Sequence, residues 1–120
     1  IVDTSGVQRA ARARELLDAV SNRPVRYVIL THGHGDHAGG LGVWVEPGTE
    51  VVAQAGFAEF LHYQARLAGF FGRRNAAQFG LPVPPERPWA GNFGATVPAT
   101  ILFEKEHAFA LGGLEFQLLH

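Results

Sequence analysis

The 120-residue chain contains no cysteine and no methionine, and its 10 lysines and arginines nearly balance 11 aspartates and glutamates. The absence of cysteine excludes disulfides and cysteine-ligated zinc sites, although it does not identify the redox compartment. The balanced charge gives no indication of a nucleic-acid-binding surface, so we expect no nucleic-acid partner. No run reaches the about 18 apolar residues that a membrane-spanning helix needs, and we expect no membrane span.

The missing methionine also bears on the ends of the chain. A translated protein begins with methionine, whereas this sequence begins with IVD, which is typical of the end of a strand. It stops in LEFQLLH, which is typical of a strand that continues. We therefore expect residues 1–120 to be one partial domain, truncated at both ends. The compartment stays open between cytoplasm and periplasm, and the oligomeric state is unknown.

Hydrophobic patterning predicts alternating strands and helices. Apolar residues from Val7 to Val20 recur at helical spacing, and Thr4 or Ser5 is placed to cap this helix. The stretch VRYVIL, residues 25–30, is rich in β-branched side chains and is typical of a buried strand. A strand, a helix and a strand joined by short links predict a parallel crossover, and hence an α/β fold.

The rest of the chain predicts further elements of both kinds. A proline-rich loop is expected from Leu81 to Pro98. Trp44 is expected in the core, His62 at a packed or surface position, and His107 at an exposed strand start. The remaining expected elements are a short helix in AGGLGVW, a strand in EVVAQ, one long helix from Phe57 to Phe79, and strands in TILFE, HAFALGG and LEFQLLH, with Gly112-Gly113 as a hairpin turn.

The stretch THGHGDHAGG, residues 31–40, places three histidines and an aspartate directly after the expected buried strand. In open α/β sheets, sites form where loops leave the carboxyl ends of strands. In extended backbone His32 and His34 point to the same side and can meet one ion together. Asp36 and His37, after a turn, can face a second ion. Imidazole with carboxylate suits zinc, iron or manganese better than calcium.

Two glycines separate these side chains. Gly33 and Gly35 remove side chains between the ligands and permit unusual backbone angles. The alternatives are a polar loop that happens to be rich in histidine and a metal-scavenging histidine tract. Both are disfavoured because the residues lie between a buried strand and a packed segment.

The sequence HGHGDH after a hydrophobic strand, with VDT at the end of an earlier strand, resembles the His-x-His-x-Asp-His signature of the metallo-β-lactamase superfamily. The resemblance implies an αββα sandwich, of which this chain covers mainly part of the N-terminal half. It implies that His32 and His34 bind one zinc ion and that Asp36 and His37 bind a second, with iron or manganese as alternatives. Asp36 is also the candidate catalytic residue that orients the nucleophile, and Asp3 would support the motif loop without binding metal.

A narrower resemblance concerns FLHYQARLAGFFGRRNAAQFG, residues 60–80. It is similar to a helix of alkyl sulfatase-type members, which carry paired arginines followed by an aromatic residue and glycine. Gln64 departs from this pattern, because an asparagine is expected there. Adjacent helical residues point about 100° apart, so at most one of the two arginines is expected to face a site, and a solvated helix face is the alternative. The candidate substrate-binding residues are Arg73, Arg74, Trp89 and Phe93.

The resemblance implies a metal-dependent hydrolase that uses a metal-bound hydroxide to cleave an ester-type small molecule, with alkyl sulfates as candidates. One alternative is an iron-dependent redox enzyme on the same scaffold, of the sulfur dioxygenase or flavodiiron type. Another is a non-catalytic fragment or binding module. The remaining metal ligands are expected beyond residue 120, so His120 is not assigned as a ligand and the isolated piece is expected to be inactive.

Overall fold

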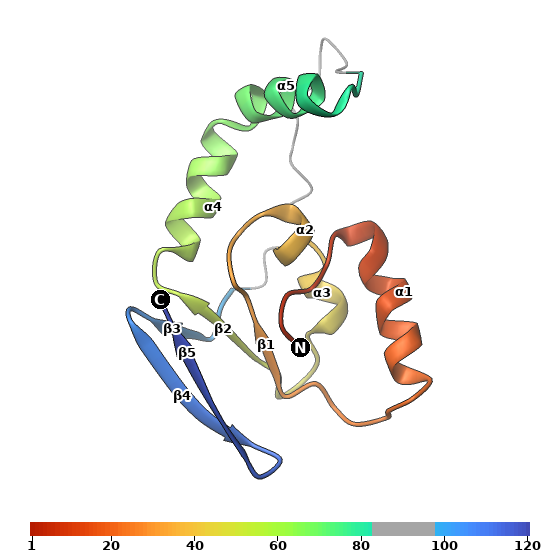
Figure 1. Cartoon of the computed structure of the whole chain (residues 1–120), viewed down its shortest axis with the longest axis vertical. Helices are drawn as coiled ribbons and strands as arrows, with labels where there is room; N and C mark the ends of the chain where they lie inside the picture. The colour runs from red at the N-terminus through yellow and green to blue at the C-terminus, as the bar shows by residue number, and fades with distance from the viewer. Residues whose placement is uncertain (83–97) are drawn as a thin grey trace.

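The computed structural model describes residues 1–82 and 98–120, so Trp89 and Phe93 lie outside the described residues. A parallel sheet contains β1 (Tyr27–Ile29), β2 (Glu50–Gln54) and β3 (Ile101–Phe103) in that order (Figure 1). Val2 forms an isolated parallel bridge with Ile29, so the first residues of the chain lie beside β1. The parallel pairing expected from the strand, helix and strand pattern is thus confirmed.

Helices account for much of the remaining chain. Figure 1 shows α4 and α5 forming an arm that extends away from the sheet and over α2. In the described residues no helix is both long and apolar enough to cross a membrane. The helices are α1 (Val7–Asp18), α2 (Gly35–Ala38), α3 (Leu41–Trp44), α4 (Phe57–Arg66) and α5 (Ala68–Phe79).

The core lies between one face of the sheet and the helices α1 and α3. Val28 of β1 pairs in register with Val51 of β2, and both side chains are fully buried. Leu41 and Trp44 of α3 belong to the same buried cluster. The indole nitrogen of Trp44 donates a hydrogen bond of 3.1 Å to the backbone oxygen of Thr4. The prediction that Trp44 is a core residue is therefore confirmed.

The opposite face of the sheet contacts a hairpin of β4 (Glu106–Leu111) and β5 (Leu114–Leu119). The ring of Tyr27 in β1 stacks on Phe109 in β4, with the ring centroids 4.2 Å apart. Gly112 and Gly113 have φ angles of 63° and 82°. A two-residue hairpin turn of this kind needs positive φ at both central positions, which glycine provides without strain. The predicted hairpin is confirmed.

Three expectations for individual elements are wrong. The single helix expected from Phe57 to Phe79 divides at Leu67, where φ is −106° and ψ is 17°, outside the helical range. Neither Thr4 nor Ser5 caps α1, because the N-cap position is Gly6 and has no side-chain hydrogen bond. His107 is not exposed: it is half-buried in β4, and its Nε2 atom has no hydrogen-bond partner in the described part of the chain.

Candidate metal centre

The loop that follows β1 carries the four candidate ligands. His32 and His34 lie in the loop itself, and Asp36 and His37 lie in the short helix α2. A Cβ atom on Gly33 would lie 2.6 Å from a ring carbon of Phe60, so the absence of a side chain there lets α4 approach the loop. Neither Gly33 nor Gly35 has a positive φ, so the additional backbone freedom that glycine permits is not used at these two positions.

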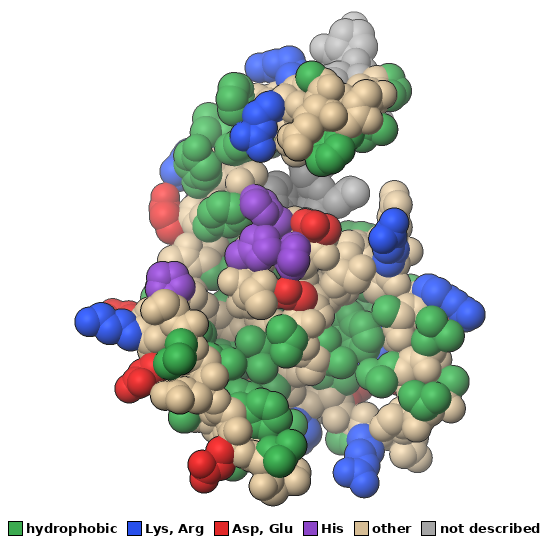
Figure 2. Space-filling view, in the orientation of Figure 1, with side chains coloured by type: hydrophobic (Ala, Val, Ile, Leu, Met, Phe, Trp, Pro, Cys, Tyr) green, Lys and Arg blue, Asp and Glu red, His purple; other side chains and the backbone are tan. Residues whose placement is uncertain are grey.

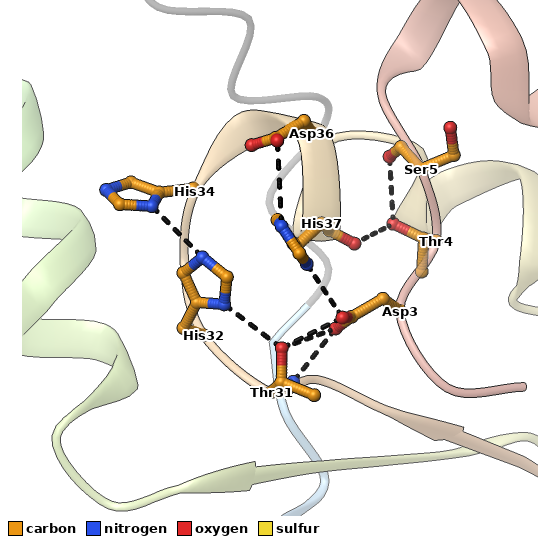
Figure 3. A network of polar contacts seen from close by, with 8 residues as sticks. All are labelled: Asp3, Thr4, Ser5, Thr31, His32, His34, Asp36 and His37. Atoms are coloured by element: carbon orange, nitrogen blue, oxygen red, sulfur yellow. Dashed lines mark hydrogen bonds and ion pairs between the residues drawn. The ribbon is translucent and has the colours of Figure 1, made fainter.

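The four side chains converge in two pairs (Figure 3). The Nε2 atom of His32 lies 3.0 Å from the Nδ1 atom of His34. The Nε2 atom of His37 lies 3.6 Å from a carboxylate oxygen of Asp36. The rings of His32 and His37 are also neighbours, with centroids 4.0 Å apart. On the molecular surface, Figure 2 shows a group of adjoining histidine side chains below the arm of α4 and α5, with a further histidine apart from the group.

These distances allow a test of whether the residues fit a metal ion. Zn–N bonds of about 2.0–2.1 Å place two ligands of one tetrahedral ion about 3.3 Å apart. The observed 3.0 Å and 3.6 Å separations lie on either side of this value. Within residues 1–82 and 98–120, no three His, Cys, Asp or Glu side chains are arranged to hold one ion. The chain therefore offers two half-sites of two donor atoms each, and both donor sets fit zinc.

Asp3 orients the imidazole rings of His37 and His32 through hydrogen bonds on the side away from the proposed ions. Its Oδ2 atom lies 2.8 Å from the Nδ1 atom of His37 and accepts a 2.8 Å hydrogen bond from the hydroxyl of Thr31. A carboxylate can only accept, so the Nδ1 atom of His37 carries a proton, and in the neutral imidazole its Nε2 atom keeps a lone pair. The Thr31 hydroxyl, which donates to Asp3, can accept from the Nδ1 atom of His32 at 3.0 Å. Both Nε2 atoms are thus available as ligands.

The same contacts shift the protonation of these groups. The hydrogen bond that His37 donates to the Asp3 carboxylate raises the pKa of His37 above its ordinary value. Burial, followed by the positive charges of His37 and His34, lowers the pKa of His32. For Asp3 burial acts in the raising direction, but hydrogen bonds from His37 and Thr31 outweigh it and lower the pKa. Asp3 is therefore a carboxylate near neutral pH, and His32 favours the neutral form that binds metal.

The backbone before α1 is also joined to the motif. Thr4 is buried, and its backbone nitrogen and hydroxyl donate hydrogen bonds of 2.6 Å and 2.7 Å to the backbone oxygen of His37. Asp3 and Ser5 have positive φ angles of 55° and 61°, which are uncommon for residues with side chains. Sequence reasoning missed Thr4, because no local pattern indicates a contact between residues 33 positions apart.

A pocket of about 810 Å³ adjoins the half-sites. Its walls come from the start of α1, the start of α2, and the arm of α4 and α5. His34, Asp36 and Arg74 line the pocket, whereas Arg73 is not among its lining residues. Arg9 of α1 also lines it, although no local sequence pattern indicates this residue as part of a site. The structure thus brings one of the two paired arginines to the site.

Comparison with known proteins identifies sulfatases as relatives. The alkyl/aryl-sulfatase BDS1 of Saccharomyces cerevisiae is 39% identical over 70 residues, which cover 52% of this chain and 11% of that enzyme. The structure of the stereoselective inverting sec-alkylsulfatase Pisa1 from Pseudomonas sp. matches with a TM-score of 0.73 and 22% identity, covering 98% of this chain and 22% of that chain. A double mutant of the same sulfatase matches with a TM-score of 0.71 and 23% identity, and the match covers 97% of this chain and 22% of the mutant chain.

The chain thus spans less than a quarter of the length of these relatives. The family match to residues 1–118 and these structural matches together confirm the predicted α/β fold of the metallo-β-lactamase type. Members of this superfamily generally bind divalent metal ions, typically zinc. The family model described as the metallo-beta-lactamase superfamily matches residues 1–118. The chain therefore belongs to the metallo-beta-lactamase superfamily.

Proposed function

We propose that this chain provides the first metal-binding motif and part of the substrate pocket of a metal-dependent hydrolase that cleaves alkyl or aryl sulfate esters. The observation that carries the proposal is the convergence of two donor pairs, His32 with His34 and Asp36 with His37, at the edge of an 810 Å³ pocket. The sulfatase names of the relatives support sulfate esters as the substrate class.

Each pair has its own part in the proposed site. His32 and His34 would hold one ion through Nε2 and Nδ1, and Asp36 and His37 would hold the second. When bound, such ions acidify water at neutral pH and offset negative charge on the leaving oxygen. The Asp36 side chain is 81% exposed, so one carboxylate oxygen can face His37 while the other accepts a hydrogen bond from the attacking water.

Asp3 and Thr31 serve as positioning residues in this proposal. They hold protons on the Nδ1 atoms of His37 and His32, which fixes the tautomer that presents Nε2 to the site. Because Asp3 contacts His37 directly and His32 through the Thr31 hydroxyl, one carboxylate orients a ligand of each ion. In this proposal the hydrogen bonds of Asp3 and Thr31 therefore connect the two half-sites.

Metal content and hydrolysis in the full-length protein test the proposal. We expect wild type to contain zinc and to release sulfate from 4-nitrophenyl sulfate or octyl sulfate. His34→Ala should lose tightly bound metal and lower kcat/KM by at least about 100-fold. Substitution of a residue that only hydrogen-bonds to a metal ligand typically lowers metal affinity or activity about 10–100-fold, and loss of a ligand itself should cost more. His62→Ala is the matched control, because His62 is exposed on α4 and does not line the pocket.

Two outcomes would contradict the proposal. Full metal occupancy in His34→Ala would show that the ligand assignment is wrong. Bound iron, with oxygen consumption and no release of sulfate, would favour the redox alternative on the same scaffold.

A further inference from the structure

We infer that Arg9 of α1 and Arg74 of α5 determine specificity by selecting substrates that combine a negative charge with an apolar chain. The inference deepens the proposed function and rests on it, because it concerns how the same pocket recognises its substrate. It assigns a role to Arg9, which lies more than 20 residues before the metal motif in the sequence and reaches the site only through the fold.

The charge of the pocket supports an anionic ligand. Arg9 and Arg74 both line it, and neither forms an ion pair with an acidic side chain in the described residues. Asp36 is the acidic side chain among the described lining residues, so the two arginines leave a formal charge of +1 before any metal binds. Guanidinium groups present paired donors that match two oxygens of one anion, which suits a sulfate group.

Three other arginines of the chain are already paired with carboxylates. Arg12 pairs with Glu15 at 2.8 Å, and Arg14 pairs with Asp18 at 2.9 Å. Arg66 of α4 pairs with Glu59 at 3.2 Å. These guanidinium groups already have carboxylate partners on the protein. Among the arginines that have no such partner in the described residues, Arg9 and Arg74 line the pocket, where they can bind an external anion, whereas Arg23, Arg26 and Arg73 do not line it.

The apolar lining supports a chain attached to that anion. The guanidinium carbon of Arg74 lies 5.4 Å from the ring centroid of Phe71, so cationic and apolar surface are adjacent on α5. Val7 and Phe79 line the same pocket and are 44% and 64% exposed. Exposed apolar side chains around a concave site favour binding of an apolar group. An amphiphile can therefore direct its head group to the arginines and its chain along Phe71 and Phe79.

Binding of octanesulfonate to the full-length protein tests the inference without catalysis. This probe has a C–S bond in place of the ester oxygen and is not cleaved as an ester. Calorimetry below its micellar concentration should give a Kd about fivefold to tenfold higher for Arg9→Gln and for Arg74→Gln, since a charge-assisted hydrogen bond is lost in each. The Kd for octanol, which has the same chain without the charge, should not change.

The chain offers a matched control for each variant. Arg73→Gln removes a neighbouring charge that does not line the pocket, and Arg12→Gln removes an exposed arginine on the same helix as Arg9. Both should bind octanesulfonate like wild type. An equal loss of affinity in the controls would overturn the inference, because it would indicate a general effect of net charge.

The two proposals can fail separately. Sulfate ester hydrolysis together with unchanged sulfonate binding in Arg9→Gln and Arg74→Gln would overturn the inference and leave the proposed function in place. Arginine-dependent sulfonate binding without any hydrolysis would overturn the proposed function and support the anion selectivity of the pocket. Matching thermal unfolding of all variants would exclude misfolding as the cause of lost binding.

Discussion

At the scale of single residues, the charge of Asp3 controls the protonation of His37. Asp3→Asn removes that charge and keeps a similar shape, and asparagine also tolerates positive φ. We therefore expect the pKa of His37 to fall in the variant, because the hydrogen bond to the carboxylate is what raises it. Proton NMR titration of the chelator-treated protein measures the change. Asp18→Asn, which removes a carboxylate paired with Arg14, should leave the titration of His37 unaltered.

The pKa shifts of Asp3 and His37 determine how the stability of the fold depends on pH. The pKa of Asp3 is lowered from 3.8, so its contribution to stability is present above that value and disappears as pH falls through the folded-state pKa. The pKa of His37 is raised from 6.5, so its contribution is present below 6.5 and disappears as pH rises through the folded-state pKa. The melting temperature of metal-free wild type should therefore exceed that of Asp3→Asn by the largest margin between pH 3.8 and pH 6.5. A gap that widens towards alkaline pH would contradict the pairing.

At the residue scale, prediction from sequence succeeds where the spacing of two residues alone determines which way their side chains point. The i, i+2 spacing of His32 and His34 predicts that they point the same way, and their nitrogens do lie 3.0 Å apart. The contacts of Thr4 and the location of Arg9 could not be predicted, because both depend on where α1 packs against the loop after β1. Arg9 has the same local pattern as the solvent-facing arginines of its helix.

At the scale of elements, the junction between α2 and α3 needs a glycine for space. A Cβ atom on Gly40 would lie 2.4 Å from the Cβ atom of Ala10 and 2.5 Å from the backbone oxygen of Thr4. Gly40→Ala should therefore push α1 away from the loop and lower the free energy of unfolding by about 1–3 kcal/mol. Urea denaturation monitored by circular dichroism measures this loss.

Gly42 gives the matched control for that substitution. It lies in α3, and a Cβ atom there would meet no other atom within 4 Å. Gly42→Ala should leave stability unchanged or raise it by up to about 1 kcal/mol, since alanine has the higher helix propensity. Equal stability of the two variants would show that the close approach of α1 to Gly40 does not constrain the fold.

The sequence predicts elements that have a strong local pattern. It does not predict helix boundaries that depend on contacts with distant parts of the chain. EVVAQ is a strand as expected, and the hairpin turn follows from two adjacent glycines. The break at Leu67 had only the weak signal of nearby Gly69, because glycine lowers helix propensity without fixing where a helix ends. Gly6 is the N-cap of α1, and the hydroxyl of Thr4 donates to the backbone oxygen of His37 instead of capping the helix.

At the scale of the whole molecule, the half-sites join segments that are distant in sequence. His37 contacts Asp3 and Thr4 near the first strand, and the ring of His34 lies 5.3 Å from that of Phe60 in α4. The loop of residues 31–40, which carries the candidate ligands, therefore lies between the sheet and the arm of α4 and α5 (Figure 1). A fixed conformation of this loop should therefore stabilise both the sheet and the arm of α4 and α5.

Metal removal should consequently lower the stability of the full-length protein. A ligand that binds only the folded state adds about 2.7 kcal/mol when its free concentration is 100 times its Kd. Excess chelator should thus lower the melting temperature of wild type, measured by differential scanning calorimetry, and restored zinc should reverse the change. In His34→Ala, which lacks one donor of the first pair, chelator should have a much smaller effect. A chelator effect of equal size in wild type and His34→Ala would mean that the stabilising metal binds elsewhere in the protein.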